Sequence, residues 1–446
     1  MNKLILSVFS LLMFILPVSG TIALRNILIS ILIFALIINF FKEKYFLDIL
    51  KPNKDLLIIL FALLVFLLYA FFHSMYLSEV PEWSLKNFRE HLFYASMYFI
   101  VGILLANFIH KSKIVSARTI VTILFFSMFL HILYIDLVAL DRLWNSGEIL
   151  RRYGGFIKHI TAANYITNIL LAMSISELVY RLRVKKRILL ISDGILYLLL
   201  VFCIISTYIE SLRLGDISLV FLGVGSAVVF LYKNNEFSKQ KRRLIATSLI
   251  VILSTPLAYN IAMDPRWSKL IETVPLAINS ANSKHWVDHS AQMPITESGY
   301  AVGGSNYVRI FRAKKSVDFI MNDPFGIGYG GDSFGRAFKK IYPEYGKKEY
   351  HGRDSHSAIL SLTIGIGIPG LMLWLVFVYI VVKVSINNFK ESYNYFSIMT
   401  LFIIMGMFSR SFVDTNMRDH VFLQYMIILG ISLFFMIKGK SSAHIR

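Results

Sequence analysis

Long apolar runs alternate with short polar segments along most of the chain. An α-helix rises about 1.5 Å per residue, so a run of about 20 apolar residues crosses the hydrocarbon core of a bilayer. We therefore predict an all-α polytopic membrane protein with about 12 transmembrane helices, at residues 4–19, 26–41, 56–74, 92–109, 118–139, 161–180, 188–207, 217–232, 244–262, 358–382, 394–409 and 421–437.

The composition agrees with this class and excludes others. Of the 446 residues, 56% are hydrophobic and 16% are charged, and the mean hydropathy is +0.62. A soluble fold of this length does not need so much apolar surface. The first apolar run resembles a secretory signal, but its cleavage pattern is unconvincing and a second run follows at once, so we keep it as the first helix. The single cysteine, Cys203, excludes an internal disulfide and a thiolate metal cluster.

Membrane topology is the first explanation of the formal net charge of +19. Cytoplasmic loops collect Lys and Arg, and two short loops are strongly basic, at residues 181–187 and 239–243. With the N-terminus inside, both loops are cytoplasmic, and an even number of helices returns the C-terminus to the same side. The charge therefore requires no nucleic-acid partner.

The segment between the ninth and tenth predicted helices is too long for a simple connection. We divide the chain into nine helices (1–262), a large outer loop with short helices (263–355), and three helices with a cytoplasmic tail (356–446). Within the loop, the pattern predicts a helix over 305–321 that ends at Asn322-Asp323-Pro324. Its predicted apolar face consists of Tyr307, Ile310, Phe311, Val317 and Met321.

A histidine lies where this loop enters the tenth predicted helix. His356 directly precedes the apolar run, and Gly367 follows it by about 16 Å along a helix. Such a position holds an imidazole at the boundary of water and lipid, and the glycines allow other helices to approach closely. Our interpretation is that His356 acts on a substrate that arrives from the lipid. The alternative is a boundary histidine without chemistry.

Arginines recur near the predicted outer ends of the helices, where the topology rule does not favour cations. A guanidinium group presents a planar fork that suits a phosphate group and keeps its charge when partly desolvated. Taken together, these arginines suggest an anionic ligand such as a lipid-linked diphosphate. The alternative is that single arginines reach lipid headgroups or pair with Glu210, Asp216 and Asp354. The arginines are Arg151, Arg152, Arg213, Arg309, Arg312, Arg353 and Arg410.

Other motifs carry less weight. The segment Gly326–Gly331 matches the dinucleotide pattern GxGxxG but follows a predicted helix, so we interpret it as a loop that needs positive φ. No GxxxxGK[ST] motif for ATP occurs. The spacing of His285, Asp288 and His289 could hold a metal, but no third ligand is convincing, and we interpret the segment as a surface loop. His73 and His131 are interpreted as hydrogen-bonded residues at helix interfaces.

Several of these residues, taken in order, resemble one family. His356-Ser357, nine residues, Gly367, two residues and Gly370 form a pattern similar to that of bacterial O-antigen ligases (WaaL-type), in the superfamily that includes Wzy-type polymerases. Three further elements resemble family signatures and lie in the same order: Arg152-Tyr-Gly-Gly155 through Asn164, Arg213, and Arg309 followed by Pro324-Phe-Gly-Ile-Gly328. Two positions depart from the family. Ala313 stands where the family has Trp, and Leu212 separates Ser211 from Arg213, so Ser211 receives no role.

The resemblance implies a membrane glycosyltransferase fold of the GT-C type. It implies transfer of O-antigen polysaccharide from undecaprenyl pyrophosphate to a sugar hydroxyl of lipid A–core, on the periplasmic face of the bacterial inner membrane, with inversion and without metal or nucleotide. In this scheme His356, Arg309 and Arg213 are catalytic. The pyrophosphate is bound by Arg152, Arg213, Arg309, Arg312, Arg353 and Arg410.

Two other functions stay open. A Wzy-type polymerase would use the same donor with a second lipid-linked glycan as acceptor, and no physical feature of the sequence separates the two. A lipid-linked-glycan flippase would need cations along a path through the helices. In this chain the charges within the predicted helices are sparse and the arginines collect at one face, which favours catalysis.

Overall fold

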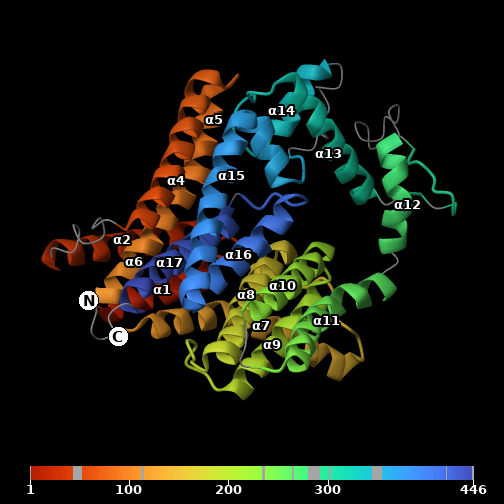
Figure 1. Ribbon diagram of the computed structural model, residues 1–446. Helices are drawn as coiled ribbons and strands as arrows, with labels where there is room; N and C mark the ends of the chain where they lie inside the picture. Colours follow the sequence, from red (N-terminus) through yellow and green to blue (C-terminus); the bar gives the residue numbers. More distant parts are fainter. Residues whose placement is uncertain are drawn as a thin grey trace.

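The computed structural model describes residues 2–43, 53–111, 115–233, 237–263, 266–279, 292–299, 301–302, 304–343, 354–417 and 419–443. Nearly all of them are helical (Figure 1). The helices before the large loop are α1 (Asn2–Ile15), α2 (Ile22–Glu43), α4 (Lys54–Phe72), α5 (Pro81–Asn87), α6 (Tyr94–Lys111), α7 (Ala117–Ser146), α8 (Ile160–Val184), α9 (Asp193–Glu210), α10 (Arg213–Leu231) and α11 (Lys239–Met263). Those that follow are α12 (Arg266–Asn279), α13 (Gly304–Asn322), α14 (Ser333–Ile341), α15 (Ala358–Ser392), α16 (Tyr395–Ser411) and α17 (Asp419–Ala443).

Shorter turns extend some of these helices. A π-helical turn, His73–Leu77, lengthens α4, and another, Phe88–Phe93, joins α5 to α6. The fourth apolar helix therefore runs from Pro81 to Lys111, which is longer than the predicted range 92–109. A 3₁₀ turn at Gly155–Ile157 precedes α8.

The all-helical membrane class is confirmed. Within the described residues, 9 helices are long and apolar enough to cross a membrane. Three shorter apolar helices, Asn2–Ile15, Gly215–Leu231 and Tyr395–Ser411, coincide with the remaining predicted runs. The count of twelve spans stays a prediction, because these three are short for the thickness of a bilayer.

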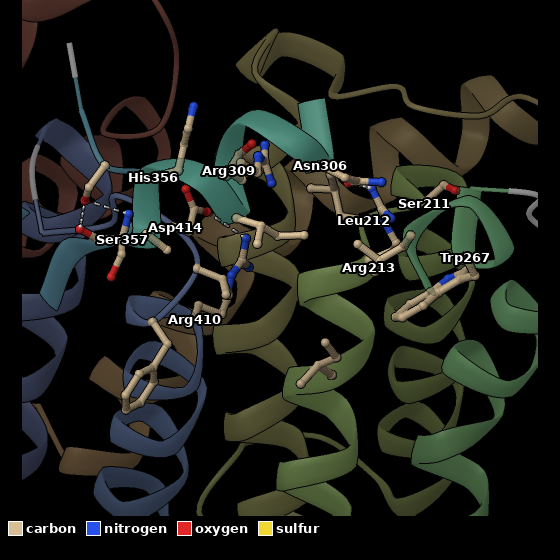
Figure 2. A pocket seen from close by; sticks show the side chains of 18 of the residues that line it. Ser211, Leu212, Arg213, Trp267, Asn306, Arg309, His356, Ser357, Arg410 and Asp414 are labelled. Carbon is tan, nitrogen blue, oxygen red and sulfur yellow. Dashed lines mark hydrogen bonds and ion pairs between the residues drawn. The ribbon is translucent and has the colours of Figure 1, made fainter. Parts of the chain in front are cut away.

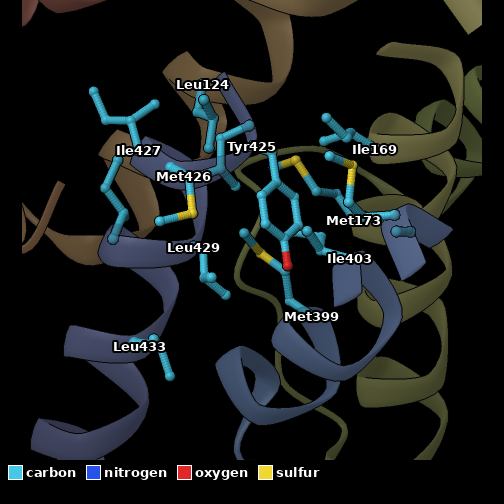
Figure 3. Close-up of a cluster of buried hydrophobic side chains, with 14 of the residues drawn as sticks. Leu124, Ile169, Met173, Met399, Ile403, Tyr425, Met426, Ile427, Leu429 and Leu433 are labelled. Carbon is cyan, nitrogen blue, oxygen red and sulfur yellow. The ribbon is translucent and has the colours of Figure 1, made fainter. Parts of the chain in front are cut away.

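The outer surface of the bundle is apolar, and its interior is closely packed. Large side chains such as Phe34 and Phe61, 66% and 67% exposed, point away from neighbouring helices, as expected for contact with lipid. In the interior, α7, α8, α16 and α17 meet around Tyr425, with Met173 and Met399 fully buried beside it (Figure 3). Flexible methionine side chains fill the irregular space around this ring.

The predicted loop helix is confirmed as α13, but its apolar face is partly wrong. Tyr307 and Phe311 are buried, whereas Val317 and Met321 are exposed. The helix packs its first half against α12 and its second half, through Phe319, against α14 and α15. Two neighbours at different angles bury two different faces, so one stripe does not describe the helix. Figure 1 shows α12, α13 and α14 at one end of the bundle.

Candidate active site

A break in α15 fixes the large loop to the membrane helices. Gly367 has φ 75° and ψ 176° inside the helix, a conformation that is accessible to glycine and strained for other residues. The break frees backbone groups of the helix, and the loop satisfies them. The backbone N–H groups of Ile327 and Gly328 donate to the carbonyls of Ile364 (3.0 Å) and Gly365 (2.9 Å), and the N–H of Ile368 donates to the carbonyl of Pro324 (2.8 Å). Non-helical backbone at this depth requires such partners.

Two side chains of α4 and its π turn complete this junction. The hydroxyl of Tyr69 donates to the carbonyl of Ile366 at 3.1 Å. The Nε2 atom of His73 lies 2.7 Å from the carbonyl oxygen of Phe325. Because α13 ends at Asn322, directly before this junction, its position relative to the start of α15 is fixed. The first part of α15 lies between His356 and the break at Gly367, and the large loop contacts it at both ends. This accounts for the spacing between the histidine and the glycine.

His356 lies immediately before α15 and is held on both ring nitrogens. Its Nδ1 lies 3.3 Å from Oδ1 of Asp354, and its Nε2 lies 3.0 Å from Nη1 of Arg312. A guanidinium group only donates, so Nε2 accepts and the ring proton is on Nδ1, facing the carboxylate. Burial lowers the pKa of His356; Asp354 opposes this shift, and Arg312 and Arg309 add to it. The lowered pKa favours the neutral form of the ring.

The backbone around His356 is also constrained. His356 has a φ of 57°, and its N–H donates to Oδ1 of Asp354 at 2.9 Å. Ser357 caps α15, since its hydroxyl accepts from the N–H of Leu360 at 3.2 Å. These contacts place the imidazole on a rigid helix start.

A cavity of about 490 Å³ opens beside this imidazole (Figure 2). Four arginines from separate parts of the chain line it: Arg152 before α8, Arg213 at the start of α10, Arg309 on α13 and Arg410 at the end of α16. Cationic and apolar groups share the walls, because Trp267, Leu270, Ile310 and Phe412 also line the cavity.

The arginines differ in how firmly they are held. Arg410 is 1% exposed; its Nη1 donates to Oδ1 of Asn164 at 2.7 Å, and its guanidinium lies 3.6 Å from the ring centre of Tyr165. Its Nη2 lies 3.6 Å from a carboxylate oxygen of Asp414. Within the described part of the chain, its Nε and Nη2 have no hydrogen-bond partner. Buried donors of this kind favour an anion as the missing partner.

Arg213, at the start of α10, and Arg309, on α13, also line the cavity. Nη2 of Arg213 donates to Oδ1 of Asn306 on α13 at 2.8 Å, and its guanidinium lies 5.7 Å from the ring centre of Trp267 on α12. Arg309 is exposed to the cavity. Helices α12 and α13 of the large loop therefore both line the cavity.

A comparison with known families gives one match. Residues 163–375 match the family model described as O-antigen ligase (Wzy_C). This matched domain places residues 163–375 in the O-antigen ligase/Wzy superfamily. No curated protein matches its sequence. The members of this family are membrane enzymes that act on lipid-linked glycans, and the matched range of this O-antigen ligase domain contains Arg213, Arg309, Arg312 and His356.

Most of the site residues predicted from the sequence lie together. Arg152, Arg213, Arg309, Arg410 and His356 line one cavity, and Arg312 reaches it through its bond to His356. Arg353 lies outside the described residues, as do His285, Asp288 and His289. Their predicted roles stay predictions. Ala313, at the position of the family's Trp, lines the cavity and leaves space there.

The structure also tests the remaining sequence motifs. The glycine loop needs positive φ at Gly326 (87°) and Gly328 (126°), as the sequence predicted. His131 is buried, with Nε2 2.7 Å from the carbonyl oxygen of Phe14, and His73 is bonded as described, so both are structural. Among the described residues, no cluster of three metal-ligating side chains forms.

Sequence reasoning missed several residues of the cavity. Asp414 carries a weak signal, because it follows Arg410 by four positions, but it lies in a loop after α16. Trp267 and Asn306 carry no signal in the sequence. They reach the cavity only because α12 and α13 fold back over α10.

Proposed function

We propose that this protein is an O-antigen ligase of the bacterial inner membrane. It would transfer O-antigen polysaccharide from undecaprenyl pyrophosphate to a sugar hydroxyl of lipid A–core. The observation that carries the proposal is the convergence of His356 and four arginines, from widely separated segments, on one cavity. We place this cavity at the periplasmic face, with both termini cytoplasmic. Figure 1 shows the two ends of the chain near each other and away from α13 and α14.

The arginines account for donor binding and leaving-group stabilisation. The diphosphate would lie among Arg410, Arg213 and Arg309, with Arg152 nearby. Negative charge builds on the diphosphate as the sugar C1–O bond breaks, and preorganised guanidinium groups stabilise this charge. A diphosphate leaves readily, so a general acid is not required.

His356 is the base in this proposal. The acceptor hydroxyl attacks C1, its proton passes to Nε2 of His356, and undecaprenyl pyrophosphate leaves with the bonding electron pair. Asp354, beside Nδ1–H, stabilises the imidazolium that forms. A single displacement of this kind inverts the anomeric centre.

Arg312 must release His356 before this step, because its Nη1 occupies the accepting nitrogen. An incoming phosphate is the natural partner for Arg312, since a charge-assisted bond to a phosphate is stronger than one to a neutral imidazole. Donor binding would then expose the base. This order keeps His356 inactive until the diphosphate is bound.

Reconstitution tests the proposal. Purified protein would be mixed with undecaprenyl-pyrophosphoryl glycan and lipid A–core, without nucleotide or ion gradient, and the product followed on a gel. We expect glycan on lipid A–core with wild type and none with His356→Ala, which should still enter the membrane. Extension of the donor glycan without transfer to lipid A–core would identify a polymerase. Absence of any covalent product would refute both enzyme functions and leave a flippase.

A further inference from the structure

A buried polar cluster, which we call the polar hub, connects Glu210, Asn164 and Thr167 to Arg410 of the cavity. Glu210, at the end of α9, is fully buried, and Oε2 of its carboxylate accepts from Nδ2 of Asn164 at 2.5 Å. Its Oε1 accepts from the hydroxyl of Thr167 at 2.6 Å. Asn164 then accepts, through Oδ1, the bond from Nη1 of Arg410 at 2.7 Å. One amide therefore connects a buried acid to a buried base on another helix.

The hub also touches α10. A Cβ atom on Gly215 would overlap the side-chain amide of Asn164, so this glycine is what allows α10 to approach. Arg213 lies two residues earlier, at the first turn of the same helix. Side chains from α8, α9 and α16 and the backbone of α10 thus meet at Asn164.

We infer that Glu210, acting through Asn164, is a positioning residue that aims Arg410 at the diphosphate. A free arginine side chain has several rotatable bonds, and fixing it before the ligand arrives saves the entropy of ordering it later. The bond to Asn164 uses Nη1. Among the described residues, Nε and Nη2 have no hydrogen-bond partner, and Nη2 lies 3.6 Å from Asp414. Glu210 never touches the substrate, and its carboxylate fixes the amide so that Asn164 presents oxygen to Arg410. This inference rests on the diphosphate ligand of the proposed function.

A second buried acid provides a matched control. Asp136 on α7 is 5% exposed, and its Oδ1 accepts from the hydroxyl of Ser206 on α9 at 2.6 Å. Like Glu210, it is an acid within the bundle that bonds a neighbouring helix. Unlike Glu210, it is not bonded to Asn164. If binding weakens because the bundle is generally disturbed, substitution of either acid should weaken it. If binding weakens because Arg410 is no longer positioned, only substitution of Glu210 should weaken it.

The test measures binding of farnesyl pyrophosphate, a short prenyl diphosphate, to purified full-length protein in detergent by calorimetry. Glu210→Met replaces the acid by an apolar side chain of similar length, and Asp136→Leu makes the corresponding change at the control. We expect Glu210→Met to weaken binding roughly ten- to a hundredfold, the range for a buried charge-assisted bond. Asp136→Leu should bind as wild type does. Size-exclusion profiles and thermal unfolding would verify that each variant is folded.

A double variant decides whether Glu210 acts through Arg410. Arg410→Met alone should weaken binding, and adding Glu210→Met should weaken it no further. The double variant removes the buried acid and the buried base together, which avoids leaving either one without the other. Equal losses from Glu210→Met in both backgrounds would overturn the inference, as would equal losses from Glu210→Met and Asp136→Leu or the absence of wild-type binding. Wild type that binds the probe but transfers no glycan would refute only the proposed function.

Discussion

Replacing Asp354 by asparagine removes one negative charge beside His356 and Arg312 and preserves the shape of the side chain. The carboxylate Oδ1 lies 3.3 Å from Nδ1 and also accepts the N–H of His356 at 2.9 Å. Asparagine has an oxygen in the same place, so Asp354→Asn keeps the turn and the acceptor. The attraction between the carboxylate and a protonated ring is lost, and so is the attraction between this carboxylate and Arg312.

The size of this attraction can be bounded. Two unit charges 3.3 Å apart interact by about 1 kcal/mol in water and about 5 kcal/mol at an effective dielectric constant of about 20. The imidazole is 36% exposed and the carboxylate 13% exposed, so solvent screening places the loss near the lower end, at about 2 kcal/mol. If the imidazolium forms in the transition state, the transfer rate falls by roughly thirtyfold.

The pH profile of transfer tests the role of His356 independently, through the direction in which its acidic limb moves. A neutral base is active above its pKa and inactive below it, so the acidic limb of kcat/KM reports the pKa of His356. Burial lowers this pKa, Asp354 raises it and Arg312 lowers it. The limb should therefore move to lower pH in Asp354→Asn and to higher pH in Arg312→Gln.

The assay is steady-state transfer from a defined lipid-linked glycan between pH 4 and 8 (about four units around the ordinary histidine pKa), with protein stability followed over the same range. Limbs that move in the same direction in the two variants would refute the assignment of His356 as base. An undiminished plateau in Asp354→Asn would refute the role given to the carboxylate.

Three further predictions concern the arginines, the break in α15 and the intramembrane histidine. Arg213→Lys and Arg309→Lys should lower transfer by tenfold or more, as a rough expectation, because a point charge does not replace a bidentate fork; wild-type rates in either variant would contradict this. Gly367→Ala places a side chain at φ 75° and against the backbone of Phe325, so the yield of folded protein should fall, by a destabilisation of about 1–3 kcal/mol or more. His131→Phe removes the bond to Phe14 and should lower thermal stability while transfer by the remaining folded protein stays near wild type; loss of transfer without loss of stability would show a catalytic role.

Periodicity predicted the helices well because each one satisfies its backbone hydrogen bonds within its own segment. The long apolar runs appear as helices at the predicted places, and the loop helix α13 ends at Asn322 as predicted. The predictions that failed concern residues whose burial depends on neighbouring helices. The apolar face of α13 was misassigned at Val317 and Met321, since two different neighbours bury two different faces of this helix.

Part of the site could also be predicted from the sequence. His356 and the arginines were recognisable as individual residues, because the topology rule does not favour cations at the predicted outer ends of the helices. The bonds that give them their chemistry were not recognisable. Arg312 was predicted to bind phosphate, and the structure shows it bonded to the imidazole; the pairing depends on how α13 lies over the start of α15.

The order of apolar and polar residues by itself determined the membrane class, the helices, and the presence of a histidine and several arginines at helix ends, because these follow from local burial in lipid. Tertiary structure alone decided which of these residues share a cavity, which nitrogen of His356 faces Asp354, and that Glu210 reaches Arg410 through one amide. Such contacts join residues as far apart as 246 positions in the chain, and no local pattern encodes a distance of that kind.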